Sequence, residues 1–277
     1  MKLIATAKLN LLLHITGKYE NGYHALESLF AFCEDLFDEI DIEPSYKLSV
    51  EVVKSDFPEA YEIKQEYNLL YKLLNFLDLK FDVKLTKKIP IGAGLGGGSC
   101  DAGALLRFLV EHSYIKESDL KNVGKFGADI IPCMQQKACF GTGIGDEIIA
   151  YPTLPRIYAL VIKPDFNIST IDIYKKSVSS FKESISNQDW SFDSIEYFKS
   201  FIQDKKNSLL EPILYFHPEI KEVIECLALL NGCFYSNASG SGSACFALFE
   251  TRAQADEARL EFMSLYPGYK AYTTGIR

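Results

Sequence analysis

Apolar and polar residues alternate along much of the first 90 positions, and one stretch with helical spacing interrupts them. The segment Leu3–Ile15 is extended in character and is followed by turn-forming residues at Gly17–His24. Alternation over Phe37–Glu43 and Leu48–Val53 is typical of half-buried antiparallel strands. From Asn68 the period becomes that of a helix, whose buried stripe consists of Leu70, Leu73, Leu74 and Leu77.

A strand, a glycine-rich loop and a helix follow one another between residues 81 and 109. Apolar residues at every second position of Phe81–Leu85 predict a strand that runs into the loop Pro90–Cys100. Ser99 is expected to cap the helix that follows, and Asp101 favours the positive end of that helix. Leucines at positions 105, 106 and 109 give the helix a buried face.

The second half of the chain predicts a separate α+β domain. Two prolines break the pattern within Tyr151–Arg156 and Ile157–Ile162 restarts as a buried strand, so we expect domains at residues 1–152 and 153–277. One large α/β domain is the alternative. Lys182–Asp204 shows only a weak helical pattern. The other expected elements are helices at Ile220–Leu230 and Ala253–Leu265 and strands at Cys233–Tyr235, Cys245–Phe249 and Tyr269–Thr274.

Composition narrows the functional classes. With 277 residues, 48% hydrophobic and 24% charged, the chain can bury a full core. Its net charge of −8 argues against a nucleic-acid partner, because such proteins neutralise phosphates with lysine and arginine. No apolar run approaches the ~20 residues of a membrane span, and no signal peptide is visible. The seven cysteines lack metal-ligand spacing, which favours reduced, mostly buried thiols in a cytoplasmic protein over zinc or disulfides.

The loop is the strongest chemical signal in the chain. It places five glycines in the seven positions 92–98 immediately before a helix, so backbone amides and the helix start can cradle a phosphate. A plain flexible turn is the alternative. Gly92, Gly94 and Gly97 formally match a dinucleotide fingerprint, but no acidic residue at the end of a second strand follows at the required distance. No lysine stands where a Walker A loop requires one.

Three further features acquire meaning only in context. The turn Ser239–Ser243, with the sequence Ser-Gly-Ser-Gly-Ser, fits either a wall of the same cleft or an ordinary hairpin turn. Lys8 is the one charge in an apolar run and either reaches solvent or faces a polar cleft. Asp129, which follows a helix stop, is either a helix cap or a residue with a chemical role.

Read together, these motifs resemble a known family of enzymes. Ala7-Lys8-Leu9-Asn10-Leu11, the Pro90–Cys100 loop and the Ser239–Ser243 turn resemble the signature motifs of the galactokinase, homoserine, mevalonate and phosphomevalonate kinase superfamily. More narrowly, Ile15-Thr16-Gly17, Asn21-Gly22-Tyr23-His24, Gly-Leu-Gly-Gly-Gly-Ser and Gly127-Ala128-Asp129-Ile130 resemble the 4-diphosphocytidyl-2-C-methyl-D-erythritol kinases of the non-mevalonate isoprenoid pathway.

The resemblance implies a fold and a reaction. The implied fold is α+β, with an N-terminal domain like the second ribosomal S5 domain, a C-terminal ferredoxin-like domain and an active site between them. The implied reaction is ATP- and Mg²⁺-dependent phosphorylation of a small molecule, a cytidine diphosphate derivative of methylerythritol, at its C2 hydroxyl. Another kinase of the superfamily, or a non-catalytic binding relative, is the competing interpretation.

The resemblance also assigns roles to individual residues. It implies Lys8 and Asp129 as the catalytic pair, with Asn68 near the adenine and Ser99 near Mg²⁺. Cys100 stands where a second serine is common, and Tyr174 stands where phenylalanine is expected. The implied substrate-side residues are Asn10, Tyr23, His24, Thr170 and Tyr174. The implied ATP loop consists of Pro90, Ile91, Gly92, Ala93, Gly94, Leu95, Gly96, Gly97, Gly98, Ser99 and Cys100.

Overall fold

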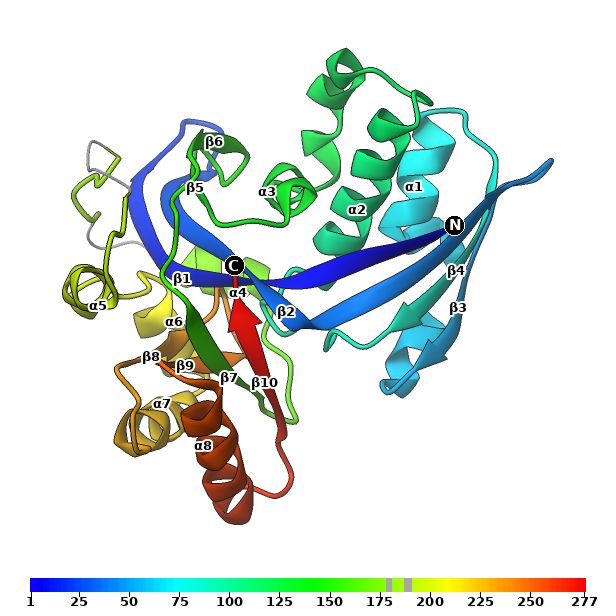
Figure 1. The fold of residues 1–277 in the computed structure, drawn as a ribbon. Coiled ribbons are helices and arrows are strands. Elements are labelled where there is room, and N and C mark those ends of the chain that lie inside the picture. Colours follow the sequence, from blue (N-terminus) through cyan, green and yellow to red (C-terminus); the bar gives the residue numbers. More distant parts are fainter. Residues whose placement is uncertain (178–180, 187–190) are drawn as a thin grey trace. The chain divides into compact units, whose positions relative to one another are not determined.

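The computed structural model describes residues 1–177, 181–186 and 191–277, which form two compact units that both contain helices and strands (Figure 1). Strands β1 (Lys2–Lys18) and β2 (His24–Pro44) and the glycine-rich loop contribute residues to both units. The division predicted between residues 152 and 153 stays a prediction. Unit 1 comprises Met1–Lys8, Leu36–Ile91 and Gly96–Gln136, and unit 2 comprises Leu9–Asp35, Gly92–Leu95 and Lys137–Arg277.

The sheet of unit 1 contains one pairing that the sequence analysis assigned wrongly. The second half of β2 pairs antiparallel with β4 (Phe81–Lys87), as the alternating pattern predicted. In contrast, β3 (Ser49–Ser55) pairs with β4 in parallel, with Val50 opposite Val83. The long connection between β3 and β4, which contains α1 (Leu69–Phe76), returns the chain to the same end of the sheet, and parallel pairing requires such a crossover.

Three helices accompany this sheet. The predicted stripe of α1 is confirmed for Leu70, Leu73 and Leu74, which are fully buried, whereas Leu77 is the C-cap residue and only partly buried. Helix α2 (Gly97–Glu111) follows the glycine-rich loop and packs against α3 (Ile130–Gln135) and α1. Short 3-10 turns complete the unit at Pro58–Glu62, Gln65–Tyr67, Glu117–Asn122 and Gly124–Phe126.

Unit 2 is built on an antiparallel sheet in the order β10, β7, β9, β8. The predicted strands at β7 (Ile157–Lys163), β9 (Cys245–Phe249) and β10 (Lys270–Ile276) are confirmed. The expected strand Cys233–Tyr235 is misplaced, because β8 begins at Tyr235 and ends at Ala238. Near the β1–β2 turn, β5 (Cys139–Thr142) pairs with β2 and with β6 (Glu147–Ala150).

The helices of unit 2 bury the apolar side of this sheet. Helix α7 (Glu219–Leu229) contacts β8 and β9, and α8 (Arg252–Leu265) contacts β7 and β10 (Figure 1). Both were predicted within two residues at each end. The weakly helical Lys182–Asp204 contains α5 (Ile195–Gln203), whereas its residues 187–190 lie outside the described part. The remaining helices are α4 (Thr170–Lys176) and α6 (Leu210–Phe216).

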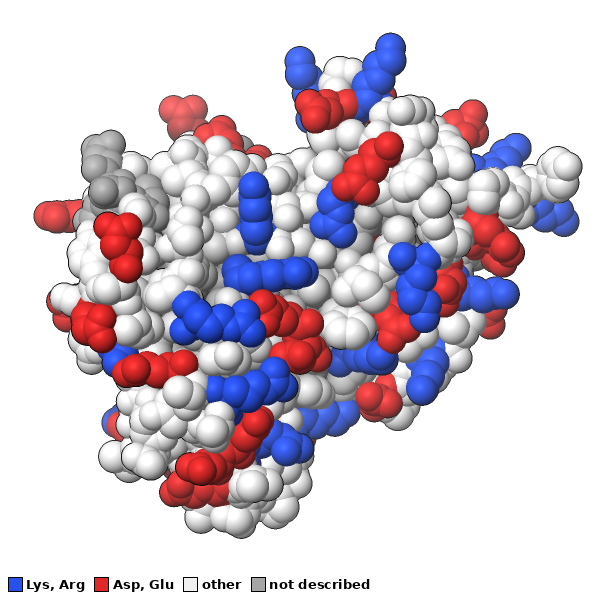
Figure 2. Space-filling view, in the orientation of Figure 1, with Lys and Arg blue, Asp and Glu red and all other residues white. Residues whose placement is uncertain are grey.

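Two features predicted or constrained by composition can be compared with the structure: the burial of the cysteines and the distribution of charged side chains on the surface. The prediction that most thiols are buried is confirmed for Cys33, Cys100, Cys133, Cys139 and Cys245. Basic and acidic side chains are interspersed on the face that Figure 2 shows. Among the described residues, no helix combines the length and the apolar character needed to cross a membrane.

Candidate active site

The glycine-rich loop joins β4 to α2 through three residues in the left-handed conformation. Gly92, Gly94 and Gly96 have φ values of 65°, 75° and 67°, which glycine adopts without steric cost. Gly96 is the N-cap residue of α2, so the prediction that Ser99 caps this helix is wrong. Ser99 is instead the third residue of the helix.

Lys8 and Asp129 meet inside unit 1. The Lys8 Nζ atom lies 3.0 Å from Asp129 Oδ2, and the exposed fractions of the two side chains are 5% and 34%. Asp129 occupies the N-cap position of α3 but makes no capping hydrogen bond with its side chain. Lys8 therefore does not reach solvent. The Asp129 carboxylate pairs with Lys8 and does not cap the backbone amides of α3.

The same lysine contacts the loop. A Cβ atom added to Gly96 would lie 2.9 Å from Lys8 Cε, so only glycine allows the loop to pass this close to the lysine. Burial acts to lower the pKa of Lys8, but the charge of Asp129 and its hydrogen bond outweigh burial and raise that pKa. Lys8 is consequently charged at neutral pH beside the loop.

Ser99 and Cys100 have different surroundings at the start of α2. Ser99 is partly exposed, and its Oγ lies 3.8 Å from the position of a Cβ on Gly127. Cys100 is buried with its Sγ 3.3 Å from the Sγ of Cys133, and burial raises the pKa of Cys133. The thiol of Cys100 therefore points toward α3.

Asn68 caps the helix that lies against the loop. Its Oδ1 accepts a hydrogen bond of 2.9 Å from the backbone amide of Leu70, which fixes the start of α1. The neighbouring Leu69 reaches the loop, since its Cδ1 lies 3.5 Å from the position of a Cβ on Gly98. Asn68 is thus held by its own helix close to the loop.

The second glycine turn contacts the first loop within unit 2. A Cβ on Gly94 would lie 2.4 Å from the carbonyl oxygen of Ser239 and 2.7 Å from that of Gly242. Ser239 Oγ also donates a hydrogen bond of 3.1 Å to the Gly94 carbonyl. The turn Ser239–Ser243 is therefore the partner of the glycine-rich loop rather than an unrelated hairpin turn.

Two predicted substrate-side residues bind this turn. The backbone amide of Asn10 donates to Ser239 Oγ at 3.2 Å, and its side-chain amide donates to Ser28 Oγ at 2.8 Å. Thr170, the first residue of α4, shares a hydrogen bond of 2.8 Å with Ser241 Oγ. Asn10, Thr170 and the two glycine segments thus form one polar cluster.

His24 and Tyr174 meet beside this cluster in unit 2. Their ring centroids are 5.5 Å apart with the planes tilted by 38°. Burial and the charge of Lys18 lower the pKa of His24, so its ring is neutral at pH 7, and its Nε2 atom is buried without a hydrogen-bond partner among the described residues. Tyr23 does not join this ring contact: it is 59% exposed and makes no aromatic contact in the described part of the chain.

The sequence analysis missed Asn207, which holds the second glycine turn in place. This buried side chain donates to the carbonyl oxygens of Ala238 and Gly240 at 3.0 and 2.6 Å, and it accepts from the Leu209 amide at 2.9 Å. An asparagine three residues before the apolar start of α6 was the available signal. Nothing in the local sequence indicates that its amide reaches the turn.

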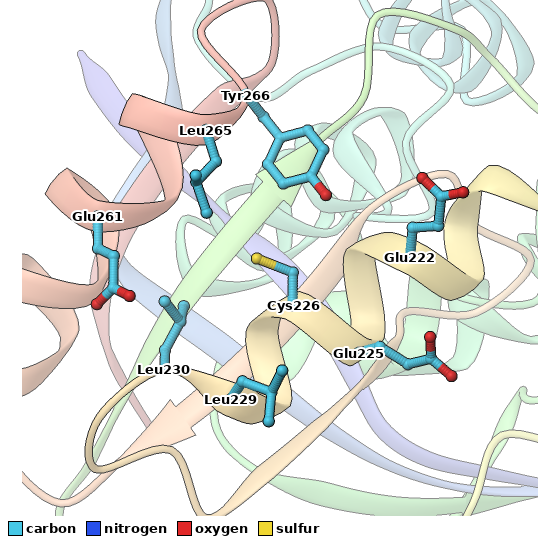
Figure 3. Close-up of a pocket in the computed structure, with 8 residues that line it drawn as sticks. All are labelled: Glu222, Glu225, Cys226, Leu229, Leu230, Glu261, Leu265 and Tyr266. Atoms are coloured by element: carbon cyan, nitrogen blue, oxygen red, sulfur yellow. The ribbon is translucent and has the colours of Figure 1, made fainter.

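A separate groove of about 490 Å³ lies between α7 and α8 (Figure 3). It combines apolar and acidic side chains and contains none of the predicted site residues, so it is not the candidate active site. Its lining consists of Glu222, Glu225, Cys226, Leu229, Leu230, Glu261, Leu265 and Tyr266.

Comparison with known proteins relates this geometry to a family. Residues 60–151 match the model of the GHMP kinase N-terminal domain, and residues 196–267 match that of the GHMP kinase C-terminal domain. A 4-diphosphocytidyl-2-C-methyl-D-erythritol kinase of Anaplasma marginale (strain Florida) is 33% identical over 98% of this chain and 96% of its own length. The same enzyme of Wolbachia pipientis wMel is 35% identical, with 98% and 97% covered.

The chain belongs to the 4-diphosphocytidyl-2-C-methyl-D-erythritol kinase family. A crystal structure of a 4-(cytidine 5'-diphospho)-2C-methyl-D-erythritol kinase matches this kinase with a TM-score of 0.75, 28% identity and coverage of 100% and 99% of the two chains. The predicted α+β fold of two GHMP kinase domains is confirmed. A homoserine kinase from Cytophaga hutchinsonii, at 15% identity and a TM-score of 0.59 over 99% and 94% of the chains, shares the fold alone. Family membership makes ATP the co-substrate.

Proposed function

We propose that this kinase transfers the γ-phosphoryl group of ATP to the C2 hydroxyl of 4-diphosphocytidyl-2-C-methyl-D-erythritol, in the methylerythritol phosphate pathway of isoprenoid precursor biosynthesis. The observation that carries the proposal is the ion pair between buried Lys8 and partly exposed Asp129, beside Gly96 of the glycine-rich loop. The relatives at 33% and 35% identity bear this substrate in their names. We place the reaction in the cytoplasm.

Asp129 is the proposed partner of the attacking hydroxyl. The C2 oxygen bonds to the γ-phosphorus, the bond from that phosphorus to the β–γ bridging oxygen breaks, and ADP leaves. Asp129 either orients the hydroxyl or accepts its proton, and its 34% exposed carboxylate leaves room for that contact. Lys8 cannot serve as the base because its raised pKa keeps it protonated. Its charge offsets the charge that grows on the transferring group.

The loop is the proposed phosphate site. Left-handed glycines expose backbone amides without Cβ atoms, and the start of α2 adds its positive end. Residues Pro90–Cys100 therefore bind ATP mainly through the backbone, with Asn68 placing its side-chain amide toward the adenine.

The hydroxyl of Ser99 near the loop fits a magnesium ion that has few protein ligands. Mg²⁺ in kinases keeps several waters and binds through one or two protein oxygens together with substrate phosphates. The described residues contain no group of three or more histidine, cysteine, aspartate or glutamate side chains arranged for a metal. The partly exposed Ser99 hydroxyl is the protein group that we propose to hold Mg²⁺. When bound, the ion neutralises phosphate charge.

The substrate side belongs to unit 2. We propose that Tyr23 stacks on the cytosine and that neutral His24 hydrogen-bonds it, because a flat aromatic face and a directional ring nitrogen suit a nucleobase. Tyr174 supports His24 from α4 and offers a second aromatic face. Asn10 and Thr170 present polar atoms from the cluster around the second glycine turn.

An ADP-release assay tests the proposal. Purified protein with ATP and Mg²⁺ is given 4-diphosphocytidyl-2-C-methyl-D-erythritol, homoserine, mevalonate or galactose in separate reactions. We expect ADP formation with the first substrate only. Turnover of one of the other alcohols in its place would move the chain to another activity of the superfamily, and ATP binding without any turnover would indicate a binding relative.

A further inference from the structure

A buried lysine links the two ends of the glycine-rich loop within unit 1. Lys87, the last residue of β4, lies before the loop, and Asp101, in α2, lies directly after it. The Lys87 Nζ atom is 2.9 Å from Asp101 Oδ2, and the two side chains are 7% and 5% exposed. This ion pair therefore joins the residues that flank the loop, inside the protein.

Asp38 of β2 completes the arrangement from the sheet. Its carboxylate contacts Lys87 Nζ and is fully buried. Its other oxygen accepts hydrogen bonds from the backbone amides of Lys88 and Ile89 at 2.5 and 2.8 Å. One carboxylate thus fixes the lysine and also the two residues that lead into the loop.

The loop itself rests on this lysine. A Cβ atom on Gly97 would lie 3.3 Å from Lys87 Nζ and 3.2 Å from Ile89 Cγ2. The loop leaves unit 1 after Ile91 and returns to it at Gly96, so the lysine lies beneath the point of return. A shift of Lys87 would therefore displace the glycines that precede α2.

We propose that Lys87, Asp38 and Asp101 are positioning residues that hold the phosphate loop in its ATP-binding shape. The cost of burying three ionisable groups supports a positioning role, since apolar side chains of similar size would stabilise a core as well. The inference rests on the proposed function, because it assigns ATP phosphates to the loop. None of the three side chains is assigned a contact with substrate.

Variants of Lys87 test the proposal, and a variant of the adjacent Lys88 serves as their control. Lys87→Met removes the link but leaves two buried carboxylates without their cation, which can prevent folding. The double variant Lys87→Met/Asp101→Leu removes the link together with one carboxylate, and Asp38 keeps its two backbone amides. Asp101 Oδ1 is buried without a partner among the described residues, so leucine there forfeits few hydrogen bonds. Lys88→Met is the control, because the 40% exposed Lys88 side chain contacts Glu39 and the ring of Phe37 and takes no part in the Lys87–Asp38–Asp101 cluster.

Two measurements separate positioning from general stability. In the folded double variant, we expect the KM for ATP to rise by about tenfold to a hundredfold while the KM for the alcohol substrate changes little. Amide hydrogen exchange should become faster at residues 91–100 and remain unchanged in β2 and β4. Lys88→Met should match the wild type in both measurements.

Two results would overturn the inference. One is a folded double variant with wild-type KM for ATP and wild-type exchange in the loop. The other is an equal rise of both KM values with faster exchange throughout unit 1, which would reduce the three residues to general structural ones. If the wild-type protein fails to turn over ATP, the proposed function is wrong, whereas the exchange comparison still tests whether Lys87 holds the loop.

Discussion

At the scale of single residues, the ion pair with Asp129 is what allows the charged Lys8 side chain to be buried. A buried lysine without a partner would lose its proton or expose itself to water. The carboxylate 3.0 Å away keeps the ammonium charged, and the exposure of Asp129 keeps one side of the pair accessible. The pair therefore presents a fixed cation and a reachable carboxylate next to a loop that suits phosphates.

Asp129→Asn tests the role of this carboxylate. Asparagine keeps the shape of the side chain but cannot accept the hydroxyl proton, so kcat should fall by about 10² to 10⁴ while substrate affinity changes little. Single-turnover rates and equilibrium binding of the substrate measure the two effects separately. Near-normal turnover would remove Asp129 from the chemical step, and lost binding with normal turnover at saturation would make it a substrate anchor.

Asp78→Asn is the matched control for that variant. Asp78 is exposed in unit 1 and has a positive φ of 53°, a conformation that asparagine also tolerates. Its turnover should equal that of the wild type. A similar loss in both variants would show that the assay reports a general effect of aspartate replacement.

Tyr23→Ala tests the proposed base contact. The ring is 59% exposed, so its removal should cost little stability. Loss of a stacked base typically costs about 1 to 3 kcal/mol, which corresponds to a rise of roughly fivefold to over a hundredfold in the KM for the cytidine substrate. Steady-state kinetics with each substrate varied in turn distinguishes this from an effect on ATP. A rise confined to the KM for ATP would contradict the assignment.

The sequence located these residues but not their partners. The motif around Lys8 and the one around Asp129 are each local, whereas the contact between the two side chains joins segments that are far apart in the chain. The same limit hid Asn207, whose importance comes from two carbonyl oxygens in a distant turn. A local motif indicates which residue has a chemical role, but the groups that this residue contacts depend on how distant segments pack.

At the scale of elements, the unit of strand, loop and helix was predicted well because its signals are local. Alternation in β4, the glycines and the leucines of α2 all act within a few residues. The helix start was wrong because Gly96 takes a left-handed cap position that serine disfavours, and this displaces Ser99 into the helix. The direction of β3 was wrong because pairing depends on the path of the intervening chain.

Gly96→Val tests the loop as an element. The residue has a φ of 67°, and an added Cβ would approach Lys8 Cε to 2.9 Å, so valine must distort either the loop or the position of Lys8. We expect ATP affinity, measured by calorimetry, to fall by more than about tenfold. Gly124→Val in the same unit is the control, because nothing lies within 4 Å of its Cβ position. Unchanged ATP affinity in a folded Gly96→Val protein would show that the loop does not hold the nucleotide.

At the scale of the whole molecule, each unit consists of several separate segments of the chain, and local sequence patterns do not predict which segments belong together. Strands β1 and β2 are long enough to take part in both units, and the glycine-rich loop has its ends in unit 1 and its middle in unit 2. Part of the loop also packs with residues from the end of the chain, since Gly94 contacts Ser239 and Gly242 within unit 2.

The stability of the whole molecule should fall as the pH drops below about 6.5, the ordinary pKa of histidine. Burial lowers the pKa of His14, and the positive charges of Lys205 and Lys182 lower it further. Burial and Lys18 do the same for His24. In the window between the ordinary pKa and these lowered values, the unfolded chain binds protons that the folded chain excludes, so the free energy of unfolding decreases with falling pH.

Denaturant unfolding at several pH values between about 7.5 and 5.5, around the ordinary histidine pKa, measures this dependence. The variant His14→Gln/His24→Gln removes both titrating rings, so the decline in this window should become shallower while the acid limb below about pH 4.5 remains. That lower limb includes Glu39, whose pKa is lowered to about 2 by hydrogen bonds from Lys2 and Lys88. A double variant with the wild-type slope between pH 7.5 and 5.5 would show that groups other than these buried histidines set the response to acid.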